Sequence, residues 1–350
     1  MEKALRFGVL AAFCGSLAGC GGGFEPPSKV QGLRAFAVRA DPASGVPGES
    51  VTLDLLRGDR RQQDGEPERE VEVAWLGGCH APPSRQFFDC YPLLVEIAKR
   101  LEPRVLETPP NRFPEGIFGG GDRFRIEIPE DVLERSPRRD TDPIHFAPSF
   151  TFFAVCAGEL VARPDLADRV PLGCVSKSTG EPVSQDDFVI GFSTVYTLEG
   201  ASNANPELEG LRFDGGLVTS ASCSDDSDCE PLDGAPQLEM ACSAASNCAP
   251  VVAACASDCP KIAVSPLIPR SSAEQLPNEG YPEVLWTSFY ANAGEFNTET
   301  QLVNDRTSGW VDEFSADWKP PRLPGTARIW VTVNDQRGGT AWSTFDVIVR

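Results

Sequence analysis

Histidine and methionine are the scarcest residues of this sequence, with two of each in 350 residues. The histidines, His80 and His145, belong to no HExxH motif and form no pair at metal-ligand spacing, so the pattern does not indicate a zinc enzyme. No GxSxG elbow is present to carry the nucleophile of a serine hydrolase. We therefore predict no catalytic residue, no metal site and no cofactor, and we interpret both histidines as loop-packing or surface residues.

Lysine and long runs with helical periodicity are also rare, whereas turn-forming residues are abundant. The sequence has 32 glycines, 31 prolines and 41% hydrophobic residues. The excess of glycine and proline favours many turns and short elements, and the apolar fraction is sufficient for real cores. The length is typical of two domains. These features together predict an all-β fold.

Positive charge is in short supply. The 31 lysines and arginines face 51 aspartates and glutamates, which gives a formal net charge of -20. Such an acidic surface repels phosphate backbones and anionic lipid headgroups. We therefore expect no nucleic-acid partner, and we expect the folded part to stand off a membrane surface.

The start of the chain has the pattern of a secretory signal. Lys3 and Arg6 form a short basic head, and residues 7–16 form an apolar run that is too short to span a membrane. Residues 17–20 (LAGC) resemble a bacterial lipobox. This resemblance implies that Cys20 is acylated and becomes the first residue of the mature protein. The alternative is an ordinary cleaved signal with a chance cysteine.

The resemblance to a lipobox also implies a location. Residues 1–19 are then the signal peptide, and residues 20–29, which are rich in glycine and proline, form a lipidated tether. Gly21, rather than aspartate, follows Cys20, which resembles default sorting to the outer membrane. We therefore expect an outer-membrane lipoprotein of the cell envelope, attached through the lipid on Cys20, on either the periplasmic or the surface side.

Ten cysteines remain after the signal peptide and Cys20. An even number in an exported chain predicts a disulfide framework, because that compartment is oxidising. The ten are Cys79, Cys90, Cys156, Cys174, Cys223, Cys229, Cys242, Cys248, Cys255 and Cys259. Cys79 and Cys90 are close enough to close a local ring, and we expect Cys156 to pair with Cys174. The pairing of the six others stays open.

The six later cysteines lie in an insert, residues 222–260, that has almost no large apolar side chains. Such a segment needs cross-links to hold it, and export favours disulfides over zinc. An acidic run, residues 225–228, begins like a calcium loop. However, Pro231 and Gln237 stand where an EF-hand requires glycine and glutamate. A looser calcium site in the insert is an open alternative.

Alternating apolar and polar residues predict a first sandwich over residues 30–200. Its expected strands are residues 33–40, 50–56, 71–76, 124–128, 150–156 and 189–198. Residues 91–101 carry the clearest helical stripe of the chain, so we expect a short helix in a loop. Short strands separated by turns are typical of an immunoglobulin-like sandwich, which buries a tryptophan such as Trp75 against the opposite sheet.

A linker at residues 201–206 opens a second predicted sandwich over residues 201–350, interrupted by the cysteine-rich insert. Its expected strands include residues 208–213, 262–268, 284–291, 326–333 and 340–349, and Trp286 is its counterpart of Trp75. In the turn of the last hairpin, Gly338 and Gly339 are expected to supply positive φ, and Asp335 is expected to bond to its own loop.

Several segments resemble the tandem immunoglobulin-like lipoproteins of Gram-negative bacteria with large genomes. They are the lipobox, residues 33–42 (LRAFAVRADP) with 47–49 (PGE), the boundary at residues 205–206 (NP), and residues 335–342 (DQRGGTAW). The resemblance implies two immunoglobulin-like sandwiches in tandem and an envelope location. It implies no catalytic residues, and a fold-level likeness does not supply a function.

One group of residues is a candidate ligand platform. Trp310 and Trp318 are interleaved with Asp312, Glu313 and Asp317, and aromatic faces beside acidic acceptors suit a sugar. The alternative is that both tryptophans pack under the second sandwich.

These observations favour a non-catalytic, membrane-anchored module that binds an envelope protein or a glycan. The alternative is a structural spacer of the envelope without a specific ligand. An exported hydrolase using acidic pairs such as Asp312 and Glu313 is the third and weakest hypothesis.

Overall fold

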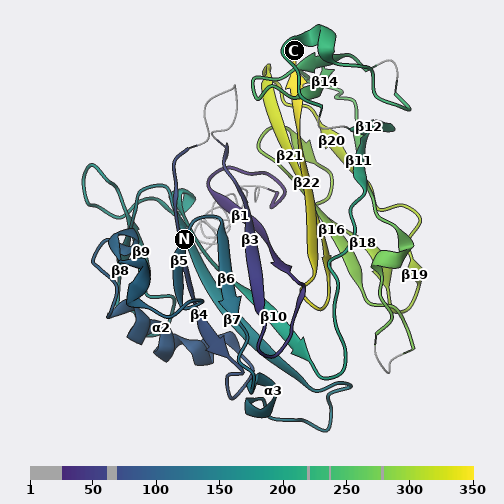
Figure 1. Ribbon diagram of the computed structural model, residues 1–350. Coiled ribbons are helices and arrows are strands. Elements are labelled where there is room, and N and C mark those ends of the chain that lie inside the picture. Colours follow the sequence, from purple (N-terminus) through teal and green to yellow (C-terminus); the bar gives the residue numbers. More distant parts are fainter. Residues whose placement is uncertain (1–25, 61–68, 219–220, 236–237, 277–279) are drawn as a thin grey trace, which may run out of the picture.

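The computed structural model describes residues 26–60, 69–218, 221–235, 238–276 and 280–350, which fold into two β-sandwiches in tandem (Figure 1). The predicted signal peptide, the predicted acylation site Cys20 and residues 21–25 of the predicted tether lie outside the described residues. Within the described ranges, no helix is both long and apolar enough to cross a membrane.

The first sandwich packs a three-stranded sheet on a five-stranded one. The smaller sheet has the order β1 (Arg34–Asp41), β3 (Ser50–Gly58), β6 (Arg123–Glu127). The larger has the order β2 (Ser44–Gly45), β10 (Phe188–Leu198), β7 (Phe146–Cys156), β4 (Glu72–His80), β5 (Phe118–Gly120). The first segment of the domain, which comprises β1 and β2, passes from one sheet to the other. Strand β1 pairs with β3 in the smaller sheet, whereas β2 pairs in parallel with β10 in the larger one. This strand order is that of an immunoglobulin-like sandwich.

The core between these sheets follows the predicted alternation. On β3, Val51, Leu53 and Leu55 are buried while the residues between them are half-buried. Trp75 is fully buried, and its ring stacks on that of Phe124 with centroids 5.7 Å apart. The prediction that Trp75 lies in the core is confirmed.

Strand β7 is buried on both faces, because the outer face of its sheet is also covered. The cover consists of η2 (Phe87–Cys90), α2 (Tyr91–Ala98) and the hairpin of β8 (Glu159–Ala162) and β9 (Leu172–Val175) (Figure 1). Disulfides Cys79–Cys90 and Cys156–Cys174 fasten it to β4 and β7, as predicted. The expected helix exists but ends at Ala98. Shorter elements of this domain are η3 (Val105–Glu107), η4 (Pro110–Arg112), α3 (Val132–Arg135) and η5 (Gln185–Asp187).

The second sandwich packs a five-stranded sheet on a seven-stranded one. The first has the order β12 (Gly216–Val218), β11 (Gly210–Phe213), β15 (Ile262–Leu267), β20 (Ala316–Lys319), β17 (Glu295–Phe296). The second has the order β13 (Met240–Cys242), β14 (Cys248–Val252), β22 (Thr340–Val349), β21 (Gly325–Asp335), β16 (Leu285–Ala291), β18 (Thr300–Asp305), β19 (Gly309–Trp310). Short 3-10 turns are η6 (Asp226–Asp228) and η7 (Arg270–Ser272).

The tryptophan in the second core is not the one expected. Trp286 lies half-buried on the outer face of its sheet, whereas Trp318 of β20 is fully buried against Phe213. In the closing hairpin, Gly338 has φ of +95° as predicted, but Gly339 does not have positive φ. Asp335 accepts hydrogen bonds from its own loop, as predicted.

The cysteine-rich insert is held by three disulfides and a small core. The bridges are Cys223–Cys242, Cys229–Cys248 and Cys255–Cys259, so all ten predicted cysteines pair. Leu232 and Met240 are buried among the sulfur atoms. Strand β14 also pairs in parallel with β22, which makes part of the insert an extension of the second sandwich.

The two sandwiches pack directly on one another. Phe36 of β1 places its ring centroid 4.8 Å from that of Tyr290 and 4.9 Å from that of Trp330. Trp330 lies on the outer face of its own sheet, yet it is only 2% exposed because the first sandwich covers it. Gly58 permits the close approach, since a Cβ there would lie 2.5 Å from the Trp330 ring.

The end of the predicted tether belongs to this packing. The N–H of Val30 donates to the carbonyl of Ala291 (2.8 Å), and the N–H of Ala291 donates to the carbonyl of Ser28 (2.9 Å). Ser28 and Val30 are buried. Residues 26–29 therefore form part of the folded body rather than a loose tether.

Candidate functional site at the junction of the sandwiches

The predicted aromatic platform is not assembled. Trp318 is fully buried in the second core, where its Nε1 donates to the carbonyl of Ala293 (3.1 Å). Trp310 is half-buried and packs edge-to-face on Phe314 (6.0 Å). The platform prediction is therefore wrong, because a tryptophan that fills a core cannot also offer its face to a sugar.

The acidic members of that set lie on the surface with other partners. Asp312 lies 3.8 Å from Arg270, and Asp317 lies 3.7 Å from Lys261 while also accepting from Asn297. Glu313 is exposed. The structure thus gives these carboxylates no shared cleft with the two tryptophans.

The two histidines occupy packed positions. His80 Nδ1 lies 2.9 Å from Ser149 Oγ, but Ser149 is fully buried and cannot meet a substrate. Burial lowers the pKa of His80 to about 4, and the charge of Arg135 acts in the same direction. His145 Nε2 lies 3.1 Å from the carbonyl of Ser136.

The insert holds one group of residues at metal-ligand distance. The sulfur atoms of Cys223, Cys229 and Cys248 lie within 4.8 Å of one another. All three are in disulfides, whereas metal binding requires thiolates. In the nearby acidic run, Asp225 and Asp228 form a capping box at the start of the turn η6. These groups therefore serve the insert's own structure.

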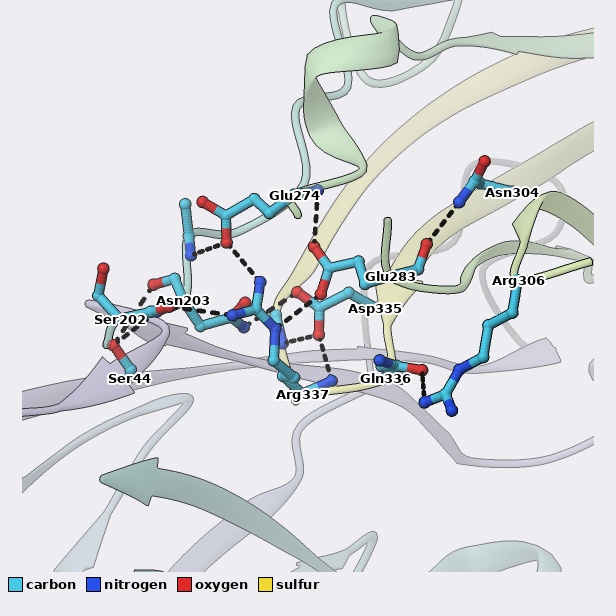
Figure 2. Close-up of polar contacts among 12 residues, drawn as sticks. Ser44, Ser202, Asn203, Glu274, Glu283, Asn304, Arg306, Asp335, Gln336 and Arg337 are labelled. Carbon is cyan, nitrogen blue, oxygen red and sulfur yellow. Dashed lines mark hydrogen bonds and ion pairs between the residues drawn. The ribbon is translucent and has the colours of Figure 1, made fainter. Parts of the chain in front are cut away.

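The densest set of buried polar contacts lies instead at the junction of the sandwiches (Figure 2). Asn203 of the linker donates from Nδ2 to Asp335 Oδ2 (3.0 Å), and its N–H donates to Ser44 Oγ (3.0 Å). Asp335 Oδ1 accepts from the N–H groups of Arg337 (2.7 Å) and Gly339 (2.8 Å). The linker is therefore pinned to the hairpin of β21 and β22.

Arg337 ties further segments into this junction network, as Figure 2 shows. Its guanidinium donates to Glu274 (2.5 Å), to Glu283 (2.8 Å) and to the carbonyl of Ser202 (3.0 Å). Glu283 is fully buried, and this burial raises its pKa in spite of Arg337. Burial likewise raises the pKa of Asp335. A buried carboxylate of this kind destabilises the fold unless a paired cation and hydrogen bonds offset the loss of its hydration.

Asn205 completes the connection between the two domains. Its Nδ2 donates to the carbonyl of Ala40 (2.7 Å), and its Oδ1 accepts from the N–H of Thr340 (2.8 Å). Three of the segments that carried the family resemblance, residues 33–42, 205–206 and 335–342, thus meet at one place. Their common feature is a structural role at the junction.

A cleft of about 470 Å³ opens beside this network, and we call it the junction cleft. Residues 35–38 of β1 and residues 192–194 and 196 of β10 form its first-sandwich side, and Phe153 contributes to its lining. Trp286 and the hairpin residues 334–336 face them from the second sandwich. Its lining combines aromatic rings with polar backbone and side-chain groups.

Strand β10 presents an open edge to this cleft. It pairs with β7 along its whole length, but on the other side it pairs only with β2, at Tyr196 and Thr197. Among the described residues, no strand pairs with that edge over residues 188–195. This segment (FVIGFSTV) has no charged residue and no proline, and Ile190 and Phe192 are 40% and 45% exposed. Natural edge strands usually carry a charged residue or a proline, which prevents another strand from pairing with the free edge.

Sequence reasoning missed this site. Residues 189–198 were expected to form a strand, but alternation does not tell which strand has a free edge. The available signal was the absence of charge from a long strand in a protein of net charge -20.

Comparisons with known proteins do not extend this description. No protein-family model matches the chain, and no curated protein matches it. Among solved structures, it is similar to the FN1–FN3 domains of chicken CNTN1, with 11% identity and a TM-score of 0.18, covering 92% of this chain and 68% of that one. It is also similar to Escherichia coli alpha-2-macroglobulin activated by porcine elastase, with 10% identity and a TM-score of 0.20. That match covers 94% of this chain and 22% of the other. The fold assignment therefore rests on the strand order of the chain itself, which is that of two immunoglobulin-like sandwiches.

Proposed function

We propose that this protein is a non-catalytic lipoprotein of the outer membrane, anchored through Cys20, that binds a partner protein at the junction of its two sandwiches. The observation that carries the proposal is the open, uncharged edge of β10 in the junction cleft. Unpaired main-chain groups at a strand edge recognise an extended segment by β-strand addition. This observation favours a protein partner over a glycan.

The side chains around the edge suit such a segment. Ile190 and Phe192 project from the outer face of β10, where Phe192 stacks on Phe87 with centroids 4.6 Å apart. Trp286 faces residues 192–194 and 196 across the cleft. A bound strand would pair with β10 through its backbone and place alternate apolar side chains against these rings.

Site-specific photo-crosslinking in intact cells tests the proposal. A photoreactive residue at Ile190 should give an adduct with a discrete partner, and adding Phe192→Glu should abolish it. Leu302, which is also 40% exposed, provides the matched control position in the second sandwich. Adducts of equal yield at both positions, or none at Ile190, would contradict binding at this edge.

The anchor has a separate test. Cys20→Ser should release the protein from the membrane fraction in soluble form, because the acyl acceptor is lost. A variant protein that stays with the membrane would contradict lipidation at Cys20.

A spacer function is the second candidate, and the junction network favours it because side chains of the linker and of the two domains hold the domains together. For a spacer, Phe192→Glu should leave the cellular phenotype unchanged. Deletion of residues 222–260 would not be a clean test, because β14 of the insert pairs with β22.

A further inference from the structure

Nearly every lysine and arginine in the described part of the chain has a partner. Carboxylates, backbone carbonyls or aromatic rings lie within contact distance of them, as expected for a protein with 51 acidic residues. Three cations in the described ranges make no ion pair, hydrogen bond or ring contact. They are Arg60, Lys319 and Arg322, and all three are exposed.

These three cations share one pocket. It measures about 680 Å³, and Lys29 adds a fourth cationic side chain to its lining. Among the described residues of the lining, Glu295 carries the only acidic side chain, and it forms no ion pair with the described cations. We call this feature the basic pocket. Four cations beside one carboxylate among the described lining residues create a local positive potential on an otherwise negative molecule.

The ligand chemistry follows from the donors. Guanidinium and ammonium groups that converge on a hollow are the groups that bind phosphate oxygens in proteins. We propose that the basic pocket binds the phosphate group of an anionic lipid headgroup at the membrane surface.

The position of the pocket points to a lipid as the source of the phosphate. Pro26 contributes to the lining, and Pro26 is only six residues from Cys20. Six residues span at most about 20 Å. This step rests on the proposed anchor at Cys20, which would hold the pocket within reach of the headgroups.

A second feature of the same loop also suits a membrane surface. Leu323 follows Arg322, lines the pocket and is 76% exposed, the highest value among the exposed large hydrophobic residues. Prolines at positions 320, 321 and 324 restrict the backbone around it. An apolar tip beside cations is typical of segments that dip into the headgroup region, whereas free phosphate would not require it.

Vesicle binding by the unacylated protein tests the inference. The full-length chain with Cys20→Ser should sediment with phosphatidylglycerol vesicles and not with phosphatidylcholine vesicles. We expect vesicle binding to weaken about 100-fold when Arg60→Gln, Lys319→Gln and Arg322→Gln are added to this protein. Each cation near a membrane surface contributes roughly a fivefold increase in affinity, and the three factors multiply. Leu323→Ser should weaken it further.

The matched control removes the same charge elsewhere. Arg125→Gln, Arg135→Gln and Arg138→Gln alter exposed arginines of the first sandwich that pair with surface carboxylates. This control should bind the vesicles as well as the parent protein. Equal loss in both triple variants, or equal binding to phosphatidylcholine, would overturn the inference.

Inorganic phosphate distinguishes the source of the ligand. Thermal stabilisation of the parent by phosphate, absent in the pocket variant, would support the phosphate chemistry when vesicle binding is also present. The same stabilisation without vesicle binding would overturn the lipid assignment. Because the assay uses neither acylation nor a partner protein, its failure leaves the tests at Cys20 and Ile190 unaffected.

Discussion

At the scale of single residues, the junction network shows how a few buried polar groups fix the relation of two domains. Arg337 contacts two acidic side chains and a linker carbonyl, while Asp335 receives hydrogen bonds from the linker and from its own turn. Each of these groups supplies a hydrogen bond or an opposite charge to another, so removing one leaves its partner buried without that interaction. Such a set specifies one arrangement more strongly than it adds to stability.

Removal of Arg337 should therefore be costly, and the cost should depend on pH. Arg337→Gln leaves the fully buried Glu283 without its cation and should lower the free energy of unfolding by about 3 kcal/mol near neutral pH. The folded-state pKa of Glu283 is already raised, so its contribution to stability is lost as pH rises through that pKa. Without Arg337 this loss should be larger. The difference in unfolding free energy between the variant and the parent protein should therefore shrink below about pH 4, where Glu283 is protonated in both states.

Urea denaturation at pH 4 and pH 8 measures this effect. Arg125→Gln, which breaks an exposed ion pair, is the control and should cost less than about 1 kcal/mol. A deficit for Arg337→Gln that is the same at both pH values would contradict the role given to Glu283.

His80 should make the fold sensitive to acid. Its folded-state pKa is lowered to about 4 by burial, whereas the unfolded value is 6.5. The neutral form is therefore favoured in the fold, and its contribution is lost as pH falls from about 6.5 to 4, up to roughly 3 kcal/mol. His80→Gln should flatten stability in this range. An NMR titration of His80 near its ordinary pKa would contradict this.

At the scale of elements, the disulfides differ in what they hold. Cys156 and Cys174 are buried and close a loop of 18 residues that attaches the β8–β9 hairpin to the sheet. Cys255 and Cys259 close a loop of 4 residues at the surface. In the chain-entropy model the longer loop constrains the unfolded state more.

Paired alanine substitutions test this difference. Replacing Cys156 and Cys174 should cost about 3 kcal/mol, whereas replacing Cys255 and Cys259 should cost about 2 kcal/mol or less. Chemical denaturation of the two variants gives both values. A larger loss at the surface bridge would show that the insert, rather than the hairpin, depends on its cross-link.

At the scale of the whole molecule, an aromatic contact and the junction network join the two sandwiches, so we expect them to unfold together. Trp330 should be the main apolar contribution, since its ring is buried between the domains against Phe36. Trp330→Ala should cost about 3 kcal/mol and split a single calorimetric transition into two. Trp310→Ala, at a half-buried site, is the control. A single transition in Trp330→Ala would contradict coupling through this residue.

The distribution of charge is also a property of the whole molecule. The net charge of -20 led to the expectation that the body stands off a membrane. The basic pocket changes this expectation for one end only, because a sum over the chain hides a local excess of cations. A body that is acidic overall but basic near the proposed anchor would be oriented with that end toward the headgroups.

Much of the fold could be predicted from the sequence because strands and close disulfides depend on neighbours along the chain. Alternation located β3 and the closing hairpin, and short separations suggested Cys79–Cys90 and Cys156–Cys174. The tryptophans could not be assigned in this way. Trp286, Trp318 and Trp330 all lie in strands, but only the facing sheet or the neighbouring domain decides which of them is covered.

The sequence by itself thus determined the all-β class, the two-domain division and the ten paired cysteines, because turn formers, alternation and an even cysteine count are local or additive. Tertiary structure alone decided the candidate sites. It left the edge of β10 open beside Trp286, and it brought Lys29 and Arg60 to Lys319 and Arg322 from the opposite end of the chain. The physical reason is that edges and pockets are formed by segments distant in sequence, whose contacts depend on how the two sandwiches pack.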